Sequence, residues 1–132
     1  MVADLIAGSI EIHCLRDLTR GGLASALNEI ASAAGVRLSI DEWAIPVRDE
    51  VLGACELLGL DPLYVANEGR FVAFVPEAQA DHAIVIMHAV ATEAVRVGEE
   101  AGRESSLVVL MTVLGTHRIL DLLSGEQPPR IC

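Results

Sequence analysis

Residues 14–35, CLRDLTRGGLASALNEIASAAG, contain the strand, turn and helix signals that decide the fold. Apolar and polar residues alternate over residues 9–15, a pattern typical of a half-buried strand. Over residues 23–34 the apolar residues recur instead on one helical face, and Gly35 supplies a helix stop. The polar, glycine-rich sequence DLTRGG, residues 17–22, joins the two patterns. A strand that leads directly into an amphipathic helix is typical of layered α/β folds.

The rest of the chain repeats this alternation of strand and helix signals. Further strands are expected at residues 36–40, 71–75, 107–114 and 117–122, and further helices at residues 46–59 and from residue 80 onward. The last two strands are expected to form a hairpin across Gly115-Thr116. The helix at 46–59 is expected to bury one apolar face, made of Val51, Leu52, Cys55 and Leu58. The pattern predicts an α/β (α+β) sandwich in which helices cover a mixed sheet.

The composition indicates a single domain with an aliphatic core. The chain has 132 residues, of which 52% are hydrophobic and only 3% aromatic. Its mean hydropathy of +0.48 is high, yet no apolar run reaches the roughly 18 residues that a membrane span needs. We therefore expect no membrane partner, but an exposed apolar patch that the rest of a larger protein covers. The formal net charge of −10 argues against a nucleic-acid partner, because a phosphate backbone would be repelled.

The cysteines indicate neither a disulfide framework nor a metal site. Cys14, Cys55 and Cys132 form no C-x-x-C pair, and the first two fall on apolar faces where small core residues are expected. His82 and His88 are six residues apart on a helix, too far round it to share a metal, and without a pairing carboxylate at ligand spacing we predict no metal. An odd cysteine count with a terminal thiol favours a reducing cytoplasm, and the first fifteen residues lack the basic residues of a secretory signal.

The chain ends in a polar segment that carries a thiol at its last position. We expect residues 1–123 to form the folded domain, and residues 124–132, SGEQPPRIC, to extend from it as a flexible tail. A thiolate is a good nucleophile, and Arg130 offsets the terminal carboxylate that would raise the pKa of Cys132. Fully extended, the tail spans roughly 30 Å, which allows one thiol to visit several sites.

Four sequence motifs together carry a resemblance to a known family. These are residues 14–23, residues 28–31, the NEGRF sequence at 67–71 and the closing PRIC at 129–132. They resemble the HypE family of hydrogenase-maturation proteins, which make the cyanide ligands of nickel–iron hydrogenases. The D-x-T-R-G-G signature alone resembles the wider superfamily of aminoimidazole ribonucleotide synthetase, selenophosphate synthetase and thiamine-monophosphate kinase. The PRIC ending narrows the superfamily to the family.

The resemblance also implies what lies around this chain. It covers most of residues 9–132 and corresponds to the C-terminal half of such a protein, so the domain is expected to be like the C-terminal domain of aminoimidazole ribonucleotide synthetase. The N-terminal domain, with most of the ATP site and the homodimer contacts, is expected to be missing, and Met1 to be an artificial start. The resemblance further implies that the third helix breaks near Ala91 and that residues 94–97 form a strand.

The chemistry that the resemblance implies takes place on Cys132. A HypF-like carbamoyltransferase places a carbamoyl group on the thiol, ATP phosphorylates the carbamoyl oxygen, and loss of phosphate leaves a thiocyanate. The cyanide then passes to iron on a HypC–HypD-like scaffold. ATP and Mg²⁺ are expected in the full-length protein, whereas this fragment alone is expected to bind neither and to be inactive.

The DLTRGG turn provides the first set of candidate site residues. Glycines at a helix N-terminus let a ligand approach and leave N–H groups free for an anion. The resemblance assigns Asp17, Thr19, Arg20, Gly21 and Gly22 to ligand contact, with Arg20 facing phosphate or the modified tail. The alternative is a capping turn in which Asp17 or Thr19 is the N-cap.

The second candidate site is the NEGR sequence at 67–70. The implied reaction needs a base near the carbamoyl nitrogen, and a carboxylate whose pKa is raised by burial is a suitable acceptor. Glu68 is therefore the candidate base. The alternative is a polar turn in which Glu68 and Arg70 are solvated charges.

Two other functions fit the same sequence. The chain could be a domain of another ATP-dependent synthetase or kinase of the superfamily, in which the terminal cysteine has no role. It could also be a non-catalytic domain whose apolar face and tail recruit partners. Replacing Cys132 by alanine in the full-length protein separates the HypE-like function from both alternatives, because only that function depends on the thiol.

Overall fold

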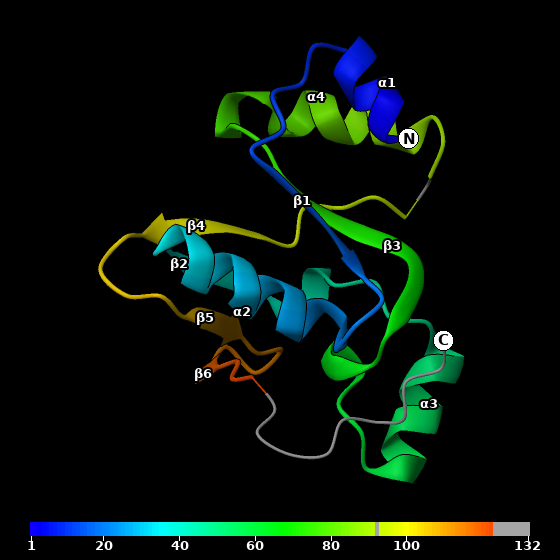
Figure 1. Ribbon diagram of the computed structural model, residues 1–132. Coiled ribbons are helices and arrows are strands. Elements are labelled where there is room, and N and C mark those ends of the chain that lie inside the picture. The colour runs from blue at the N-terminus through cyan, green and yellow to red at the C-terminus, as the bar shows by residue number, and fades with distance from the viewer. Residues whose placement is uncertain (92, 123–132) are drawn as a thin grey trace.

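The structure, a computed structural model, describes residues 1–91 and 93–122. In these residues the helices are α1 (Val2–Ala7), α2 (Gly22–Ala34), α3 (Asp49–Leu58) and α4 (Glu77–His88), with short 3-10 turns η1 (Glu42–Ala44) and η2 (Pro62–Tyr64). The strands are β1 (Cys14–Leu18), β2 (Arg37–Asp41), β3 (Asn67–Phe74), β4 (Gly98–Gly102), β5 (Val108–Met111) and β6 (His117–Ile119). Figure 1 shows their arrangement.

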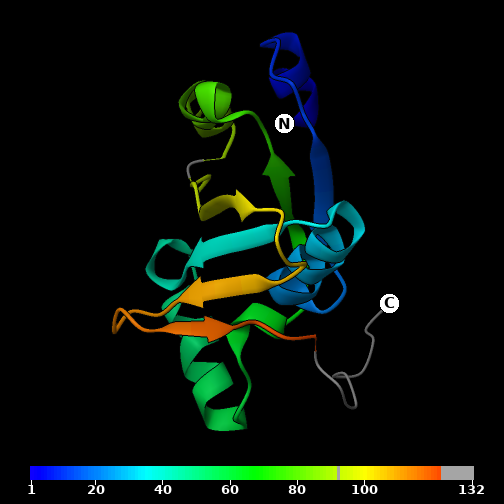
Figure 2. The same cartoon turned by 90° about the vertical axis from the view of Figure 1, so that its left-hand side faces the viewer.

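The larger sheet is mixed and has the strand order β4-β2-β5-β6. β2 runs antiparallel to β4 and parallel to β5, and β5 and β6 form the antiparallel hairpin that the sequence predicts. Helix α2 lies across one face of this sheet (Figures 1 and 2), where its Leu27 and Ala31 meet Leu38 and Ile40 of β2 in the main core. All four of these residues are buried because the helical and strand periodicities place them on facing surfaces. The predicted fold class, a mixed sheet covered by helices, is confirmed.

The smaller sheet is an antiparallel pair, β1 and β3, that leads away from the main core. At its far end α1 and α4 lie side by side (Figures 1 and 2), with Leu5, Ile10 and Ala83 in a second buried cluster. The sequence analysis did not predict α1, because six residues are too few to show a helical period. No helix among the described residues is long and apolar enough to cross a bilayer.

Several predicted boundaries are wrong. The first strand occupies Cys14–Leu18 instead of residues 9–15, because Ile10 and Ile12 pack into the second cluster and take no part in the ladder. The strand implied at 94–97 is absent, and the strand in this region is β4, which begins at Gly98 and pairs with β2. The second predicted helix begins at Asp49 and not at Pro46.

Helix α3 does not bury the apolar face that its period predicts. Cys55 is buried as predicted, but Val51, Leu52 and Leu58 are exposed, and Leu57 beside them is 90% exposed. Figure 2 shows the reason, since α3 lies below the larger sheet and outside the layer that α2 forms on it. Of the described chain, η2 is the main element that α3 contacts. α3 therefore carries several exposed apolar side chains, and their coverage by the rest of a larger protein stays a prediction.

Candidate functional site

The β1–β3 pairing brings the two candidate motifs together. The ladder pairs Asp17 with Phe71 and then, after a shift of register, Leu18 with Asn67. Residues 68–70 therefore have no opposing position in β1 and form a bulge beside the start of the DLTRGG turn. The predicted polar turn at 67–70 is thus the irregular first half of β3, and it lies against the other motif.

Asp17 organises the turn that follows β1. Its Oδ1 accepts a hydrogen bond from the Thr19 hydroxyl at 2.9 Å and a longer one from the Thr19 N–H at 3.4 Å. These bonds, and then the charges of Arg16 and Arg20, hold the pKa of the Asp17 carboxyl below its ordinary value of 3.8. The carboxylate is exposed, so it is an ionised group on the surface of the turn.

The two glycines let α2 start in a tight, left-handed turn. Gly21 is the N-cap of α2 with φ +64°, and Gly22 follows with φ +63°. A Cβ on Gly22 would lie 2.5 Å from the carbonyl oxygen of Leu63 and 2.6 Å from that of Val65. The alternative in which Asp17 or Thr19 is the N-cap is therefore wrong, since no side chain caps α2. The glycines are required for the bend and for the close approach of η2.

Free N–H groups at the start of α2 favour an anion, whereas nearby backbone carbonyl groups oppose one. The absence of a side-chain cap leaves N–H groups of a 13-residue helix available, and the exposed Arg20 stands next to them. On the other side, the carbonyl groups of residues 63–65 crowd Gly22. Ligand contact by Asp17, Thr19, Arg20 and the two glycines, including contact of Arg20 with phosphate, therefore stays a prediction.

Glu68 lies in the bulge and is exposed. The described residues do not bury its carboxylate, so the expected burial stays a prediction. Gly69 follows with φ +78°, which lets the backbone turn out of the ladder. Arg70 is not a free surface charge, because its guanidinium donates to the Pro46 carbonyl oxygen and to Glu93.

The chain is firmly held just before the segment predicted to be the tail. Asn28 Nδ2 donates to the carbonyl oxygen of Leu120 at 2.6 Å, and the Tyr64 hydroxyl donates to that of Asp121 at 2.6 Å. Burial and the nearby Asp61 carboxylate raise the pKa of Tyr64, so the phenol keeps the proton that it donates. Sequence analysis missed Tyr64, which belongs to no motif. Cys132 lies outside the described residues.

Other candidate features lie apart from this region. Cys14 is partly buried and Cys55 is buried. Among residues 1–91 and 93–122, no three histidine, cysteine or carboxylate side chains gather closely enough to hold a metal ion. A shallow hollow of about 360 Å³, lined by residues such as Asp41, Trp43 and Arg96, lies on the larger sheet and shares no residue with either motif.

Residues 1–110 match the family model described as AIR synthase related protein, C-terminal domain. The chain belongs to this family. It is also 54% identical, over 134 aligned positions, to a protein named carbamoyl dehydratase HypE from Rhodobacter capsulatus, and the match covers all of this chain and 39% of that relative. The resemblance to HypE that the motifs carry is therefore confirmed over the whole chain.

Solved structures agree with this assignment. A crystal structure of the hydrogenase maturation protein HypE in complex with ATP superposes with a TM-score of 0.92 at 42% identity, covering 99% of this chain and 41% of that one. The structure of a HypE–HypF complex contains a chain with a TM-score of 0.80 at 40% identity, covering 89% of this chain and 38% of that one. This chain thus spans about two fifths of the length of the proteins it matches.

Proposed function

We propose that this chain acts as the C-terminal part of a HypE-like, ATP-dependent carbamoyl dehydratase and supplies the cysteine on which the nitrile is built. The observation that carries the proposal is the similarity to HypE, which extends over the whole chain, from Met1 to Cys132. The pairing of β1 with β3 supports it, because the bulge that carries Glu68 then adjoins the start of the DLTRGG turn, which carries Arg20 and leads into α2.

In this proposal the tail brings the S-carbamoyl group of Cys132 to that surface. When bound, ATP supplies the phosphoryl group that turns the carbamoyl oxygen into a leaving group. The carbamoyl nitrogen gives up its two protons over the two steps, the C–O bond breaks, and the oxygen departs with phosphate, so the sulfur of Cys132 carries a C≡N group. Glu68 accepts a proton from the nitrogen, and the Arg20 guanidinium faces the phosphate.

The longer protein would supply what this chain lacks. In this proposal Arg20 makes one phosphate contact, and an N-terminal domain would hold most of the ATP site with its Mg²⁺ and would also form the homodimer. Burial of the Glu68 carboxylate would come from closure of that domain on the bulge. The same domain would cover much of the exposed apolar surface. The carbamoyl donor would be a HypF-like carbamoyltransferase, since a relative is known in a HypE–HypF complex.

The cyanide acceptor would be iron on a HypC–HypD-like scaffold. A cytoplasmic location completes the proposal, because a carrier thiol must remain reduced. Alone, the 132-residue fragment would be inactive.

The test compares wild type with Cys132→Ala in the full-length protein. Given a carbamoyltransferase, carbamoyl phosphate and ATP, the wild type is expected to release phosphate and to form thiocyanate, whereas the variant forms none. Full activity of Cys132→Ala on a small-molecule substrate would favour the alternative of another superfamily synthetase or kinase. Undiminished partner binding without any need for nucleotide or for Cys132 would favour the non-catalytic alternative, which the exposed leucines of α3 make worth testing.

A further inference from the structure

The bulge at residues 68–70 is held from outside its own sheet. Because Leu18 pairs with Asn67 and Asp17 with Phe71, the ladder defines the two ends of the bulge and leaves its middle unpaired by β1. The left-handed Gly69 adds backbone freedom at that point. A contact outside the sheet is therefore needed to fix the conformation of the bulge that carries Glu68.

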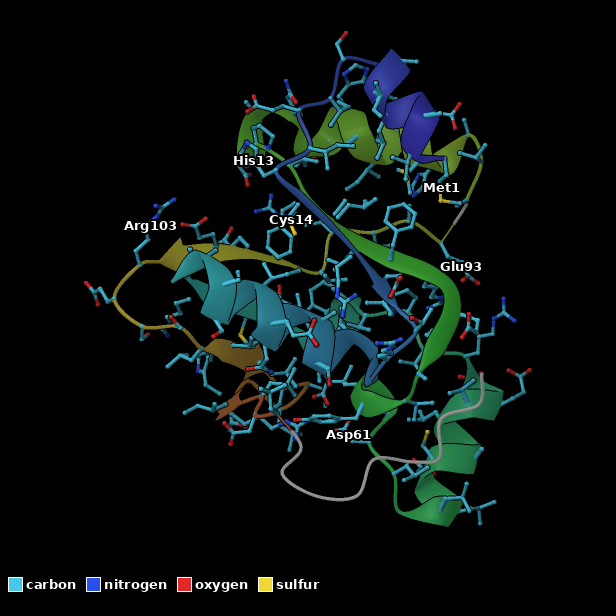
Figure 3. All side chains as sticks on the ribbon, in the orientation of Figure 1. Met1, His13, Cys14, Asp61, Glu93 and Arg103 are labelled. Carbon is cyan, nitrogen blue, oxygen red and sulfur yellow. The ribbon has the colours of Figure 1, made fainter. Side chains whose placement is uncertain are left out.

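Arg70 makes that contact. Its Nη1 donates to the carbonyl oxygen of Pro46 at 2.7 Å, and its Nη2 donates to Oε2 of Glu93 at 2.6 Å. Pro46 precedes α3 and Glu93 follows α4, so one guanidinium joins the bulge to two segments that are distant from it in sequence. Figure 3 shows Glu93 beside β3, where its second oxygen, Oε1, also lies 3.6 Å from Arg48. We refer to Arg70, Glu93 and the Pro46 carbonyl as the bulge clamp.

The geometry of the clamp suits positioning better than stabilisation. Exposed ion pairs add little to folding free energy, and the side chains of Arg70 and Glu93 are 30% and 51% exposed. Two directed N–H···O bonds from one planar guanidinium nevertheless restrict the end of the bulge in orientation as well as in distance. A displacement of about 1 Å in a catalytic group is enough to lower a rate about 100-fold.

We propose that Arg70 is a positioning residue, which through the bulge clamp holds Glu68 at the place where it accepts the proton from the carbamoyl nitrogen. The inference rests on the proposed function. It adds that the rate of dehydration depends on Arg70 through the position of Glu68, while binding of ATP does not.

Arg96 provides a matched control. Its guanidinium also donates from both Nη atoms, here to two carboxylates, with Nη1 2.7 Å from Glu77 and Nη2 2.7 Å from Glu99, and its side chain is 39% exposed. It joins α4 to β4 and contacts neither the bulge nor the DLTRGG turn. Loss of Arg96 therefore removes a similar set of bonds without touching Glu68.

The experiment measures kcat for thiocyanate formation, KM for ATP and the thermal midpoint in the full-length protein. The variants are Arg70→Met, Arg70→Lys, Arg96→Met and Glu68→Gln, and Cys132→Ala reports on the proposed function. We expect Arg70→Met to lower kcat about 10- to 100-fold with KM for ATP changed less than about twofold. Arg70→Lys keeps one charged donor at this position and should therefore recover part of the kcat that Arg70→Met loses. Arg96→Met should lower the thermal midpoint as much as Arg70→Met but leave kcat within about twofold.

Three results would overturn the inference. One is a kcat for Arg70→Met equal to that of Arg96→Met. Another is an effect of Arg70→Met confined to KM for ATP. The third is a Glu68→Gln variant as active as wild type while Arg70→Met is slow, since Arg70 would then act through a different group. Thiocyanate formation by Cys132→Ala would instead contradict the proposed function, so the two failures are distinguishable.

Discussion

Replacing Gly22 by alanine tests whether the DLTRGG turn is built for close packing. Gly22 has φ +63°, in the left-handed region that L-residues avoid, and its added Cβ would lie 2.5 and 2.6 Å from the carbonyl oxygens of Leu63 and Val65. Both oxygens belong to the backbone and cannot move like the end of a flexible side chain. Gly35 at the other end of α2 has nearly the same φ, +67°, but nothing lies within 4 Å of its Cβ position.

Comparing alanine at Gly22 with alanine at Gly35 therefore separates the cost of the left-handed backbone from the cost of steric overlap with η2. Alanine in the left-handed conformation costs about 1–2 kcal/mol, and this cost applies equally to Gly22→Ala and Gly35→Ala. Both variants also share the reduced entropy of the unfolded chain, which offsets about 0.4–1 kcal/mol. Only Gly22→Ala adds an overpacking cost of about 1–3 kcal/mol against η2. The difference between the two variants is therefore expected to be about 1–3 kcal/mol.

Equilibrium unfolding in urea measures this difference directly. Both variants should keep the m-value of the wild type, and Gly22→Ala should have the lower midpoint. Because Gly22 adjoins the carbonyl groups of η2 and Gly35 adjoins nothing, equal destabilisation by the two substitutions would refute the packing argument. It would mean that the turn and η2 are not in close contact.

Three further predictions concern the candidate site. Thr19→Val should raise the pKa of Asp17 toward 3.8 in an NMR titration, because the hydrogen bond from the Thr19 hydroxyl is lost, and an unchanged pKa would contradict this assignment. In the wild type this bond stabilises the fold at pH values above the unfolded pKa of Asp17, and the stabilisation is lost as the pH falls through the lower folded pKa. Tyr64→Phe should lower the free energy of unfolding in urea by about 1 kcal/mol, because its hydrogen bond to the Asp121 carbonyl oxygen is lost. The rate of thiocyanate formation should change less than about twofold, because freeing Asp121 lengthens the tether of Cys132 only slightly and the effective concentration of the thiol falls as the −3/2 power of tether length. A tenfold slower rate would show that this hydrogen bond matters for catalysis. Glu68→Gln in the full-length protein should lower kcat about 10²- to 10⁴-fold in steady-state kinetics without lowering stability, and an unaltered kcat would assign the base elsewhere.

The sequence predicts those elements whose partners lie within the chain. Residues 23–34 have an unambiguous helical period, and the strand at 36–40 alternates cleanly, because the helix and the strand bury facing surfaces in the main core. Helix α3 has a comparable period, yet Leu52 and Leu58 are exposed. Periodicity reports that a face is apolar, but it does not report whether the same chain covers it.

The site was predictable in its parts but not in its assembly. The motifs at 17–22 and 67–70 are visible as glycine-containing polar sequences next to apolar ones. Their contact depends on the antiparallel register of β1 and β3, including a shift that no local pattern encodes. Tyr64, which donates to Asp121, and Glu93, which accepts from Arg70 in the bulge clamp, are single polar residues that join distant segments, so only the tertiary structure identifies them.

The mass of the C-terminal peptide tests the central proposal most directly. Full-length protein is incubated with a carbamoyltransferase and carbamoyl phosphate, then with ATP, and the peptide that ends in Cys132 is analysed after each step. A gain of about 43 Da on Cys132, followed by a loss of about 18 Da that requires ATP, is expected for a carbamoyl thiol converted to a thiocyanate. An unmodified Cys132 in protein that is fully competent in hydrogenase maturation would contradict the proposal.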